Sequence, residues 1–393
     1  MGIISSSLAT GAFIVLARAD PLELRLSEGY LTLTLDGQAL PLKASSGTSR
    51  SFVFYGPEYE RMYGRGSCEK QYHGCYFCLE DDPCEGISSR KKWSVRFEDG
   101  TYQYVEHDVT LGIGEHILRN FTFGLVIHFP TPYVRDPMAI LGLSFGRPHI
   151  PEAFLEQLKR KGVITTLSYS VHVNERGPGI SGDLMLHVPY EMRSSPFVVF
   201  NERLASRKIA TSMGPVELFV PGEVKSTHSS KRGVPVLLDM GSESLLVEKK
   251  VFHKIIKKTI KSMKNSKPGV RKSRKELACE SSKWNATDDD SVVKESVVPY
   301  LPVVAFTIGE SPETVNIRIE PKHYVNFCDD ACCKLGIAPV DDSLGPAVLG
   351  HPLFRAYDVK FDLEGERVYF SRGARQTTSL TGAETIVIET HAN

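Results

Sequence analysis

The chain has 393 residues, of which 41% are hydrophobic and 24% are charged, and 47 basic residues balance 47 acidic ones. This composition is typical of a globular protein with room for two domains and a substantial core. Because the formal net charge is zero, it gives no sign of a global affinity for nucleic acid or membranes. We therefore expect no nucleic-acid partner.

Residues 1–19 predict a signal peptide. An apolar run from Leu8 to Leu16 ends in Ala17-Arg18-Ala19, which suits cleavage before Asp20. We expect a secreted protein, or one in the lumen of the secretory pathway or vacuole. Two alternatives stay open: the start Met1-Gly2 also fits an N-myristoylation pattern, and the segment could form a buried first strand.

The stretch from Tyr30 to Ala44 predicts a β-hairpin. Apolar and polar residues alternate on both sides of Asp36-Gly37, and this dipeptide is the strongest short-range signal for a two-residue hairpin turn. We therefore interpret Asp36 as a turn residue.

Residues 56–90 are rich in Gly, Cys and charge without periodicity, which indicates a cross-linked surface insertion. The eight cysteines divide evenly between the halves of the chain, which favours disulfides within each half of a secreted protein. The alternative is a zinc site that includes His73, since thiolates and imidazole at short spacing suit tetrahedral zinc. The disulfide candidates are Cys68, Cys75, Cys78, Cys84, Cys279, Cys328, Cys332 and Cys333.

Strand patterns follow from Trp93 to Val126, with a turn at Glu98-Asp99-Gly100. Residues Pro151 to Gly162 predict a short helix, because Pro begins the segment, Gly ends it and apolar residues recur at helical spacing. Asn120 and Asn285 are glycosylation candidates. Asn285 lies in a polar stretch, whereas Asn120 precedes a core strand, so its exposure is doubtful.

Residues 249–290 predict a basic helix followed by a loop. From Lys249 to Lys275 there is no acidic residue, and apolar residues recur at helical spacing as far as Met263. This surface is either a solvated face or a docking patch for a polyanion, whose binding would weaken steeply with salt. Residues 373–393 are expected to form a polar tail.

A short pattern occurs twice in the chain. Residues 237–244, LLDMGSES, and residues 42–49, LKASSGTS, both run from a strand into a turn that contains Gly and hydroxyl residues. Each half then carries an apolar-apolar-Gly segment, Ile140 to Leu143 in the first and Val348 to His351 in the second. The two halves therefore share one plan.

These residues resemble the pepsin-like aspartic proteases over residues 28–372. Residues 348–361, VLGHPLFRAYDVKF, are similar to the last signature of that family, and residues 94–101, SVRFEDGT, are similar to its hairpin flap. The resemblance implies an all-β, bilobal fold with two pseudo-twofold-related, barrel-like lobes, a central cleft and a few short helices. The lobes would be residues 20–190, with the flap at about 94–110, and residues 191–372.

The resemblance also assigns a catalytic site, with one departure. Asp239 matches the second catalytic Asp, whereas Ser45 stands at the position of the first. Met240 replaces a Thr that ties the two turns together, a role that Ser46 would partly fill. The implied substrate-binding residues are Gly47, Thr48, Phe97 (where the family has Tyr), Asp99, Gly241 and Ser242.

The chemistry of the family needs two carboxylates that share one proton, and the hydroxyl of Ser45 does not ionise near working pH. We expect a homologue that binds extended peptide with lost or strongly reduced catalysis, as a monomer without cofactor or metal. The alternative is an active acid endopeptidase that works through Asp239 and an activated water. Weaker alternatives are Ser45 as a nucleophile, Asp36 or Asp99 as a replacement acid, and a binding scaffold with an idle cleft.

Overall fold

The computed structural model describes residues 21–80, 84–97, 100–130, 138–175, 177–188, 195–200, 209–220, 227–228, 234–266, 277, 279, 292–329, 331–340 and 346–372. The expected signal peptide (1–19), the lobe boundary near residue 190, most of the loop after the basic helix and the tail (373–393) lie outside these residues. So do two candidate site residues, Asp99 and Asn285.

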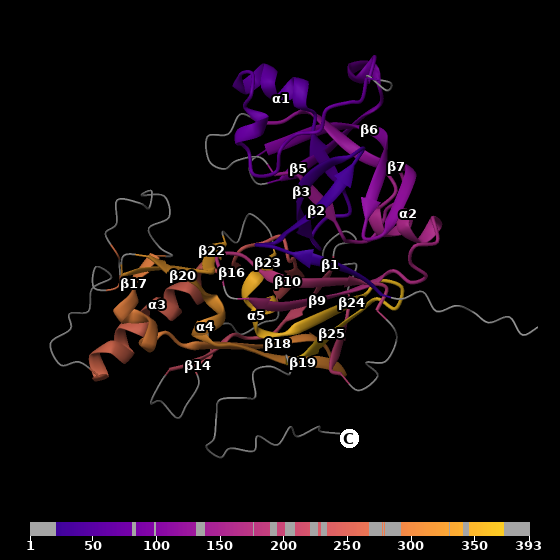
Figure 1. Ribbon diagram of the computed structural model, residues 1–393. Helices are drawn as coiled ribbons and strands as arrows, with labels where there is room; N and C mark the ends of the chain where they lie inside the picture. Colours follow the sequence, from indigo (N-terminus) through magenta and orange to yellow (C-terminus); the bar gives the residue numbers. More distant parts are fainter. Residues whose placement is uncertain are drawn as a thin grey trace, which may run out of the picture.

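The fold is mostly β and bilobal, with the first lobe above the second in Figure 1. The first lobe is a seven-stranded sheet in the order β2-β3-β8-β4-β7-β6-β5. Because β2 also pairs with β6, the sheet curls back on itself. Its strands are β2 (Tyr30–Leu35), β3 (Gln38–Ser45), β4 (Phe52–Phe54), β5 (Lys92–Phe97), β6 (Gly100–Ile113), β7 (His116–His128) and β8 (Ile140–Gly142).

The second lobe contains a nine-stranded and a three-stranded sheet. The larger has the order β14-β13-β18-β12-β15-β23-β16-β22, with β19 paired to β18. Its strands are β12 (Ala210–Met213), β13 (Glu217–Phe219), β14 (Thr227–His228), β15 (Val234–Leu238), β16 (Leu245–Glu248), β18 (Val303–Glu310), β19 (Glu313–Ile319), β22 (Ile337–Val340) and β23 (Ala347–Leu349). The smaller is β17 (Val292–Lys294), β21 (Cys332–Leu335) and β20 (Val325–Asp329).

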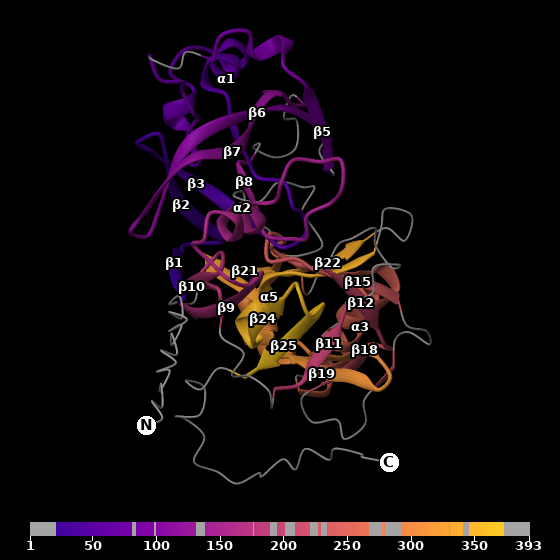
Figure 2. The ribbon, with the colours of Figure 1, turned by 90° about the vertical axis from the view of Figure 1, so that its right-hand side faces the viewer.

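A six-stranded sheet joins the lobes, in the order β1-β10-β9-β24-β25-β11. It takes strands from the beginning, the middle and the end of the described chain: β1 (Leu22–Leu26), β9 (Ser168–Glu175), β10 (Ser181–Leu186), β11 (Phe197–Val199), β24 (Asp358–Asp362) and β25 (Arg367–Ser371). Figure 2 shows β1, β9 and β10 under the first lobe and β24 and β25 within the second. The two lobes therefore share one hydrogen-bonded base.

Five α-helices occur in the described ranges: α1 (Gly56–Tyr63), α2 (Phe154–Arg160), α3 (Lys249–Ser266), α4 (Pro321–Tyr324) and α5 (His351–Ala356). Helices α2 and α3 confirm the sequence predictions. Helix α1 was not expected, because its segment lacks a clear apolar period. It forms around two buried residues, Gly56 and Tyr59, with Pro57 in its first turn.

The predicted hairpin is confirmed, with Asp36 and Gly37 as its turn. Both residues have positive φ, 48° and 81°, as a two-residue turn of type I′ requires. The Asp36 carboxylate accepts hydrogen bonds from the Tyr76 hydroxyl (2.7 Å) and the Thr110 backbone N–H (2.7 Å). Asp36 therefore holds the turn, and the idea of a displaced catalytic acid is wrong.

The cysteines form four disulfides, each within one half of the chain: Cys68–Cys75, Cys78–Cys84, Cys279–Cys332 and Cys328–Cys333. Two of them close loops in the insertion at residues 56–90. This pairing favours the disulfide interpretation over the zinc site, because sulfurs bonded to each other are not the thiolates that zinc binds.

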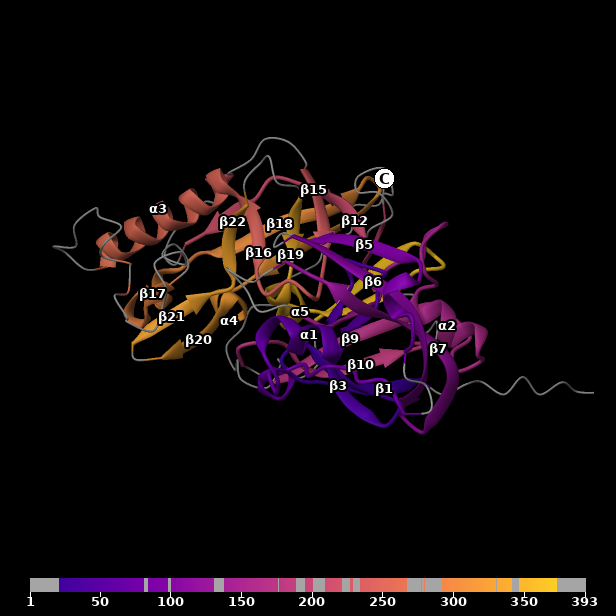
Figure 3. The same ribbon diagram turned by 90° about the horizontal axis from the view of Figure 1, so that it is seen from above.

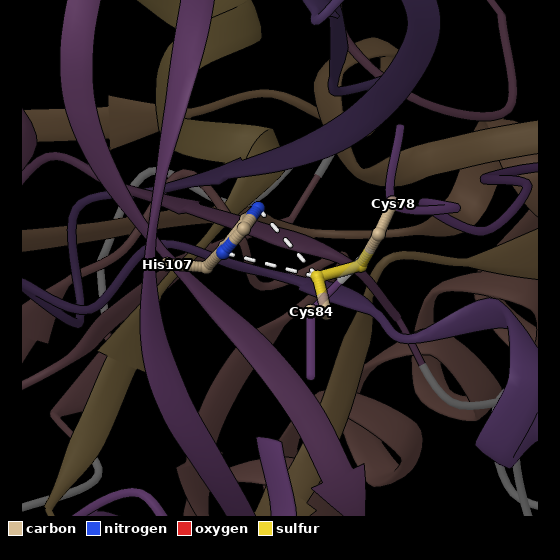
Figure 4. Close-up of side chains that lie close together, drawn as sticks. All are labelled: Cys78, Cys84 and His107. Carbon is tan, nitrogen blue, oxygen red and sulfur yellow. Dashed lines mark hydrogen bonds between the residues drawn. A yellow bond between two sulfur atoms is a disulfide. The ribbon is translucent and has the colours of Figure 1, made fainter. Parts of the chain in front are cut away.

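Figure 4 shows His107 beside the Cys78–Cys84 disulfide, with Sγ of Cys84 3.9 Å from Nδ1 and 3.7 Å from Nε2. Arg90 donates to Nδ1 (3.2 Å), and Nε2 lies 3.1 Å from the Tyr76 hydroxyl, which in turn donates to Asp36. Both ring nitrogens therefore have partners in this network. The network ties the cross-linked insertion to the hairpin turn and to β6.

Asn120 is exposed at the surface of β7, with φ of 52°. The doubt about its exposure was therefore unfounded. Asn tolerates this positive φ better than most residues, and the neighbouring Phe121 is fully buried.

Candidate active site

Two parallel strand pairs bring the repeated turns together. In the first lobe β3 pairs with β8, so that Ser45 lies opposite Gly142. In the second lobe β15 pairs with β23, so that Leu238 lies opposite Leu349. Ser45 ends β3 and Asp239 follows β15 directly, so each buried strand carries one polar side chain to the junction of the lobes.

The glycines of the apolar-apolar-Gly segments let the strands approach these turns. A Cβ on Gly142 would lie 2.6 Å from the backbone of Arg50. A Cβ on Gly350 would lie 2.3 Å from the carbonyl oxygen of Ser242. Both contacts are far shorter than real Cβ contacts, so any side chain would push the turn away from its supporting strand.

The side chains of Ser45 and Asp239 meet at the junction. The Ser45 hydroxyl donates to Oδ1 of Asp239 (3.0 Å) and accepts a hydrogen bond from the Gly47 backbone N–H (3.2 Å). The N–H groups of Gly47 (3.0 Å) and Gly241 (2.8 Å) also donate to Oδ1. Three donors thus fix one carboxylate oxygen, and no hydrogen bond to Oδ2 forms within the described part of the chain.

The turn glycines are needed for this approach. A Cβ on Gly47 would lie 2.3 Å from Oδ2 of Asp239, and a Cβ on Gly241 would lie 2.8 Å from Cβ of Ser45. The structure therefore brings together four residues that the sequence singled out: Ser45, Gly47, Asp239 and Gly241.

Ser46 links the two turns from below. Its hydroxyl donates to the Leu238 carbonyl (2.9 Å) and accepts from the Met240 N–H (2.9 Å). Ser46 and Met240 are both fully buried. Met240 has no hydroxyl that could form the reciprocal hydrogen bonds from the second turn to the first. Both side-chain hydrogen bonds of this link therefore involve the Ser46 hydroxyl.

Thr48 and Ser242 do not contact the Asp239 carboxylate. The Thr48 hydroxyl accepts from the Arg50 N–H (3.2 Å), and the Ser242 hydroxyl donates to the Ser244 carbonyl (3.1 Å). In the described structure these two hydroxyls stabilise their own turns.

Tyr169 of β9 lies beneath the site. Its ring stacks on Phe361 of β24, with centroids 4.6 Å apart, and the side chain is fully buried. Burial raises the pKa of the Tyr169 hydroxyl well above its usual value, and the negative charge of Asp239 adds to this effect. The hydroxyl lies towards Ser46 without the geometry of a hydrogen bond.

His351 supports the second turn. Its Nε2 lies 3.1 Å from the Met240 carbonyl, whereas the buried Nδ1 has no hydrogen-bond partner among the residues that the structure describes. Burial, followed by the positive charges of Lys43 and Arg355, lowers the pKa of His351 to about 3. The ring is therefore neutral at any pH above this value, and Nε2 carries the proton that it donates to Met240.

An ion pair crosses the junction beside these turns. Nζ of Lys43, in β3, lies 3.1 Å from Oε1 of Glu243, which follows the second turn. The Lys43 side chain is 6% exposed and that of Glu243 is 57% exposed. Burial alone would raise the pKa of Glu243, but the charge and hydrogen bond of Lys43 outweigh it and lower the pKa.

Comparison with protein families shows the family of this chain. A model of the family described as eukaryotic aspartyl protease matches residues 67–373, which is more than three quarters of the chain and includes the second turn. The chain belongs to this aspartyl protease family. A search of curated proteins gave no match.

Family membership and the four disulfides indicate the secretory pathway. No helix in the described ranges is both long and apolar enough to cross a lipid bilayer.

A pocket lies between the lobes beside Glu243 and His351. Its lining includes neither Ser45, Asp239 nor the hairpin of β5 and β6, so it is separate from the substrate cleft expected over the two turns. Its volume is about 270 Å³. The two lobes and the joining sheet contribute to its walls. Its lining includes Tyr30, Tyr72, Gly179, Glu243, Lys334 and His351. The rings of Tyr30 and Tyr72 meet edge to face at 4.8 Å, so the pocket offers both aromatic and charged surface.

The hairpin of β5 and β6 occupies the residues that the sequence predicts as the flap. Phe97, at the end of β5, is half-buried and packs on Phe52 (6.0 Å between centroids) and edge to face on Tyr102 (5.4 Å). Phe97 is thus held by an aromatic cluster, and its role in substrate binding stays a prediction.

Several residues of the site were missed by the sequence analysis. The motifs that were identified contain three of them, Lys43, Glu243 and His351. Their position in these motifs could have marked them as candidate site residues. Tyr169 carried no local signal, because only the pairing of β9 with β24 places it beneath the turns.

Arg355 was also missed. From α5 its guanidinium donates to the carbonyls of Gly177 (3.1 Å), Pro178 (3.2 Å) and Gly179 (2.7 Å) in the turn between β9 and β10. It also donates to Oδ1 of Asn326 (2.6 Å). Arg355 thus fastens the turn that forms one wall of the pocket to the second lobe.

Proposed function

We propose that this aspartyl protease homologue binds extended polypeptide in the cleft between its lobes and has lost most or all of its hydrolytic activity. The observation that carries the proposal is the contact between the Ser45 hydroxyl and Oδ1 of Asp239 at 3.0 Å. The hydroxyl takes the place of one oxygen of a first carboxylate, and nothing takes the place of the other.

The consequence for chemistry is the loss of one acid-base group. Two close carboxylates share a proton, so one can activate water while the other donates to the substrate carbonyl. With Ser45, Asp239 alone would have to do both. Loss of one positioned acid or base costs about two to four decades of rate, and loss of one member of a pair that acts together can cost more.

Peptide binding is supported by the parts of the site that remain. The family is one of proteases, and a hairpin of β5 and β6 occupies the residues expected to form the flap. An extended peptide would gain backbone hydrogen bonds from the hairpin and pockets for its side chains. The alternative, an active endopeptidase that uses Asp239 and an activated water, is favoured by the three donors that hold Asp239 in place.

The test compares the parent with Ser45→Asp and Asp239→Asn variants, purified as secreted full-length protein. Cleavage of a quenched fluorescent peptide library is measured from pH 4 to 7, and binding of the same library is measured by anisotropy. We expect binding without cleavage in the parent, and cleavage in Ser45→Asp that Asp239→Asn abolishes in the double variant. Cleavage by the parent that Asp239→Asn abolishes would establish the alternative, and absence of binding would refute the proposal.

A further inference from the structure

The Cys78–Cys84 disulfide has one accessible sulfur and one buried sulfur. Cys84 is 2% exposed, whereas Cys78 is half-buried and lies between two exposed apolar residues, Phe77 and Leu79. Thiol–disulfide exchange begins when a thiolate attacks a sulfur that it can reach. Cys78 is therefore the sulfur of this pair that an external thiolate would attack.

The buried sulfur lies beside basic groups. Figure 4 shows Sγ of Cys84, and not that of Cys78, next to the His107 ring. Arg90 donates to Nδ1 of this ring (3.2 Å), so the hydrogen-bond network places the ring proton on Nε2, which also lies 3.1 Å from the Tyr76 hydroxyl. Nε2 is 3.7 Å from Sγ of Cys84. A thiolate at Cys84 would thus have an N–H donor and a guanidinium charge nearby, and such groups stabilise cysteine thiolates.

A metal site is the other chemistry that these side chains suggest, because the ligand atoms of Cys78, Cys84 and His107 lie within 4.8 Å of one another. However, Arg90 occupies the lone pair of Nδ1, and its positive charge would repel a metal cation. The same charge favours a thiolate. The surroundings of Cys84 therefore fit an exchange reaction better than metal binding.

The Cys68–Cys75 disulfide has different surroundings, although it lies in the same insertion. Both of its cysteines are buried, and Sγ of Cys68 lies 3.9 Å from the Gly56 carbonyl oxygen. The negative end of a carbonyl dipole would destabilise a thiolate. Neither access nor charge therefore favours exchange at this pair.

The Cys328–Cys333 disulfide offers the sharpest comparison. Cys328 is exposed, but Cys333 is fully buried, and burial destabilises a leaving thiolate. Access alone would favour exchange at this pair, whereas stabilisation of the leaving thiolate favours Cys78–Cys84. Figure 3 shows β20 and β21, which carry Cys328 and Cys333, at the end of the second lobe away from β6. The two disulfides can therefore be compared within one protein.

The residue before Cys78 is fastened to the first lobe. The Gln38 side chain donates to the Phe77 carbonyl (2.7 Å) and accepts a hydrogen bond from the Phe77 N–H (2.9 Å). Cleavage of the disulfide would therefore leave Cys78 in place near the surface, where a second thiol can reach it.

We propose that Cys78–Cys84 is a site of thiol–disulfide exchange with an external thiol, RSH. Its thiolate attacks Sγ of Cys78, a new S–S bond forms there, and the electron pair of the broken bond goes to Sγ of Cys84. A second thiolate attacks the RS sulfur of this mixed disulfide, which releases Cys78 and forms RSSR. The protein disulfide gains two electrons, and its two thiolates take up the two protons that the external thiols gave up.

The test incubates the full-length, disulfide-bonded protein with reduced glutathione at pH 7. Samples are quenched with N-ethylmaleimide, and mass spectrometry maps the state of each cysteine. We expect Cys78–Cys84 to be reduced about tenfold faster than Cys328–Cys333, with the transient glutathione adduct on Cys78. Reduction of Cys328–Cys333 at an equal or higher rate, or an adduct mainly on Cys84, would refute the proposal.

Arg90→Gln tests the role of the charge beside the His107 ring. It should slow the reduction of Cys78–Cys84 about threefold or more, as should His107→Gln, while the rate at Cys328–Cys333 stays the same. The matched control is Arg96→Gln, because Arg96 is exposed on the neighbouring strand β5, and it should change neither rate. Circular dichroism checks that the variants are folded. Equal rates in Arg90→Gln and Arg96→Gln would overturn the proposal, whereas failure of the peptide-binding proposal would not affect this result.

Discussion

The Ser45 hydroxyl and the Asp239 carboxylate are joined across the two lobes by a hydrogen bond of 3.0 Å. This contact is possible only because the backbone of each turn approaches the side chain of the other. The site is therefore assembled by strands that lie almost two hundred residues apart in the chain, and its geometry is sensitive to small additions of volume.

Gly47→Ala should disrupt the site. Its Cβ would lie 2.3 Å from Oδ2 of Asp239, so the carboxylate or the turn must move. We expect a loss of about 1–3 kcal/mol in the free energy of unfolding, measured by urea denaturation. In the Ser45→Asp background the same change should remove any gained proteolysis.

Gly177→Ala is the matched control for this change. No atom of the described residues lies within 4 Å of its added Cβ, so the free energy of unfolding should stay within about 0.5 kcal/mol of the parent. Equal effects of the two substitutions would show that the close approach at Gly47 is not a constraint.

His351 should make the protein less stable in acid. Its pKa is lowered from 6.5 to about 3 by burial, so between these values the unfolded chain binds a proton that the folded chain does not. Stability is therefore lost as the pH falls below 6.5, by up to about 1.4 kcal/mol per pH unit. His351→Gln should flatten this dependence while keeping a donor for the Met240 carbonyl.

The measurement is urea denaturation at several pH values from 7 to 4, with His116→Gln as control because His116 is exposed. The parent and the control should lose stability in parallel. If His351→Gln follows them, the buried ring does not govern acid stability.

Arg355→Met should loosen the connection between the second lobe and the turn between β9 and β10. The substitution removes the donors to three backbone carbonyls of that turn and to Asn326. Hydrogen bonds from charged groups contribute about 1.5–3 kcal/mol each, so a total loss of about 3 kcal/mol or more is expected. Arg367→Met, which removes an exposed guanidinium stacked on Phe197, should cost less than about 1 kcal/mol.

Thermal denaturation compares the two arginine variants with the parent. A lower melting temperature for Arg355→Met but not for Arg367→Met would support the role of Arg355 in fastening the turn between β9 and β10 to the second lobe. A similar shift for both would mean that the carbonyls of residues 177–179 find other donors.

Much of this molecule was predictable from short patterns. Asp36-Gly37 predicted the first hairpin, and the doubled turns with their apolar-apolar-Gly segments indicated two halves with one plan, while the bilobal fold followed from the resemblance to the pepsin-like proteases. These signals are local, because they rest on turn chemistry and on close approaches that only Gly allows. Helix α1 was missed, since a disulfide-linked insertion packs around a few residues and needs no continuous apolar stripe.

The rest of the site depends on contacts between distant strands. Sheet order sets the positions of Tyr169 and Arg355 and the pairing of Lys43 with Glu243. A short sequence pattern does not reveal the order of strands in a sheet. Sequence patterns therefore located the residues of the two turns, whereas tertiary structure identified the groups that support them.

The ion pair between Lys43 and Glu243 should couple the lobes in a pH-dependent way. The lowered pKa of Glu243 means that the contribution of the pair is present above pH 4.5 and is lost as the pH falls through the folded-state value. Because the Glu243 side chain is 57% exposed, solvent screens the pair, and we expect a coupling energy of about 1 kcal/mol at pH 7.

A double-mutant cycle of Lys43→Met and Glu243→Gln measures this coupling from urea denaturation at pH 7 and pH 4. Because Lys43 lowers the pKa of His351 and Glu243 raises it, the cycle is measured in the His351→Gln background, which removes that acid effect. Glu243→Gln alone should cost more than the double variant, because it leaves the Lys43 ammonium, only 6% exposed, without its carboxylate. A coupling energy that is zero at pH 7, or that grows in acid, would mean that the lobes are held together without this pair.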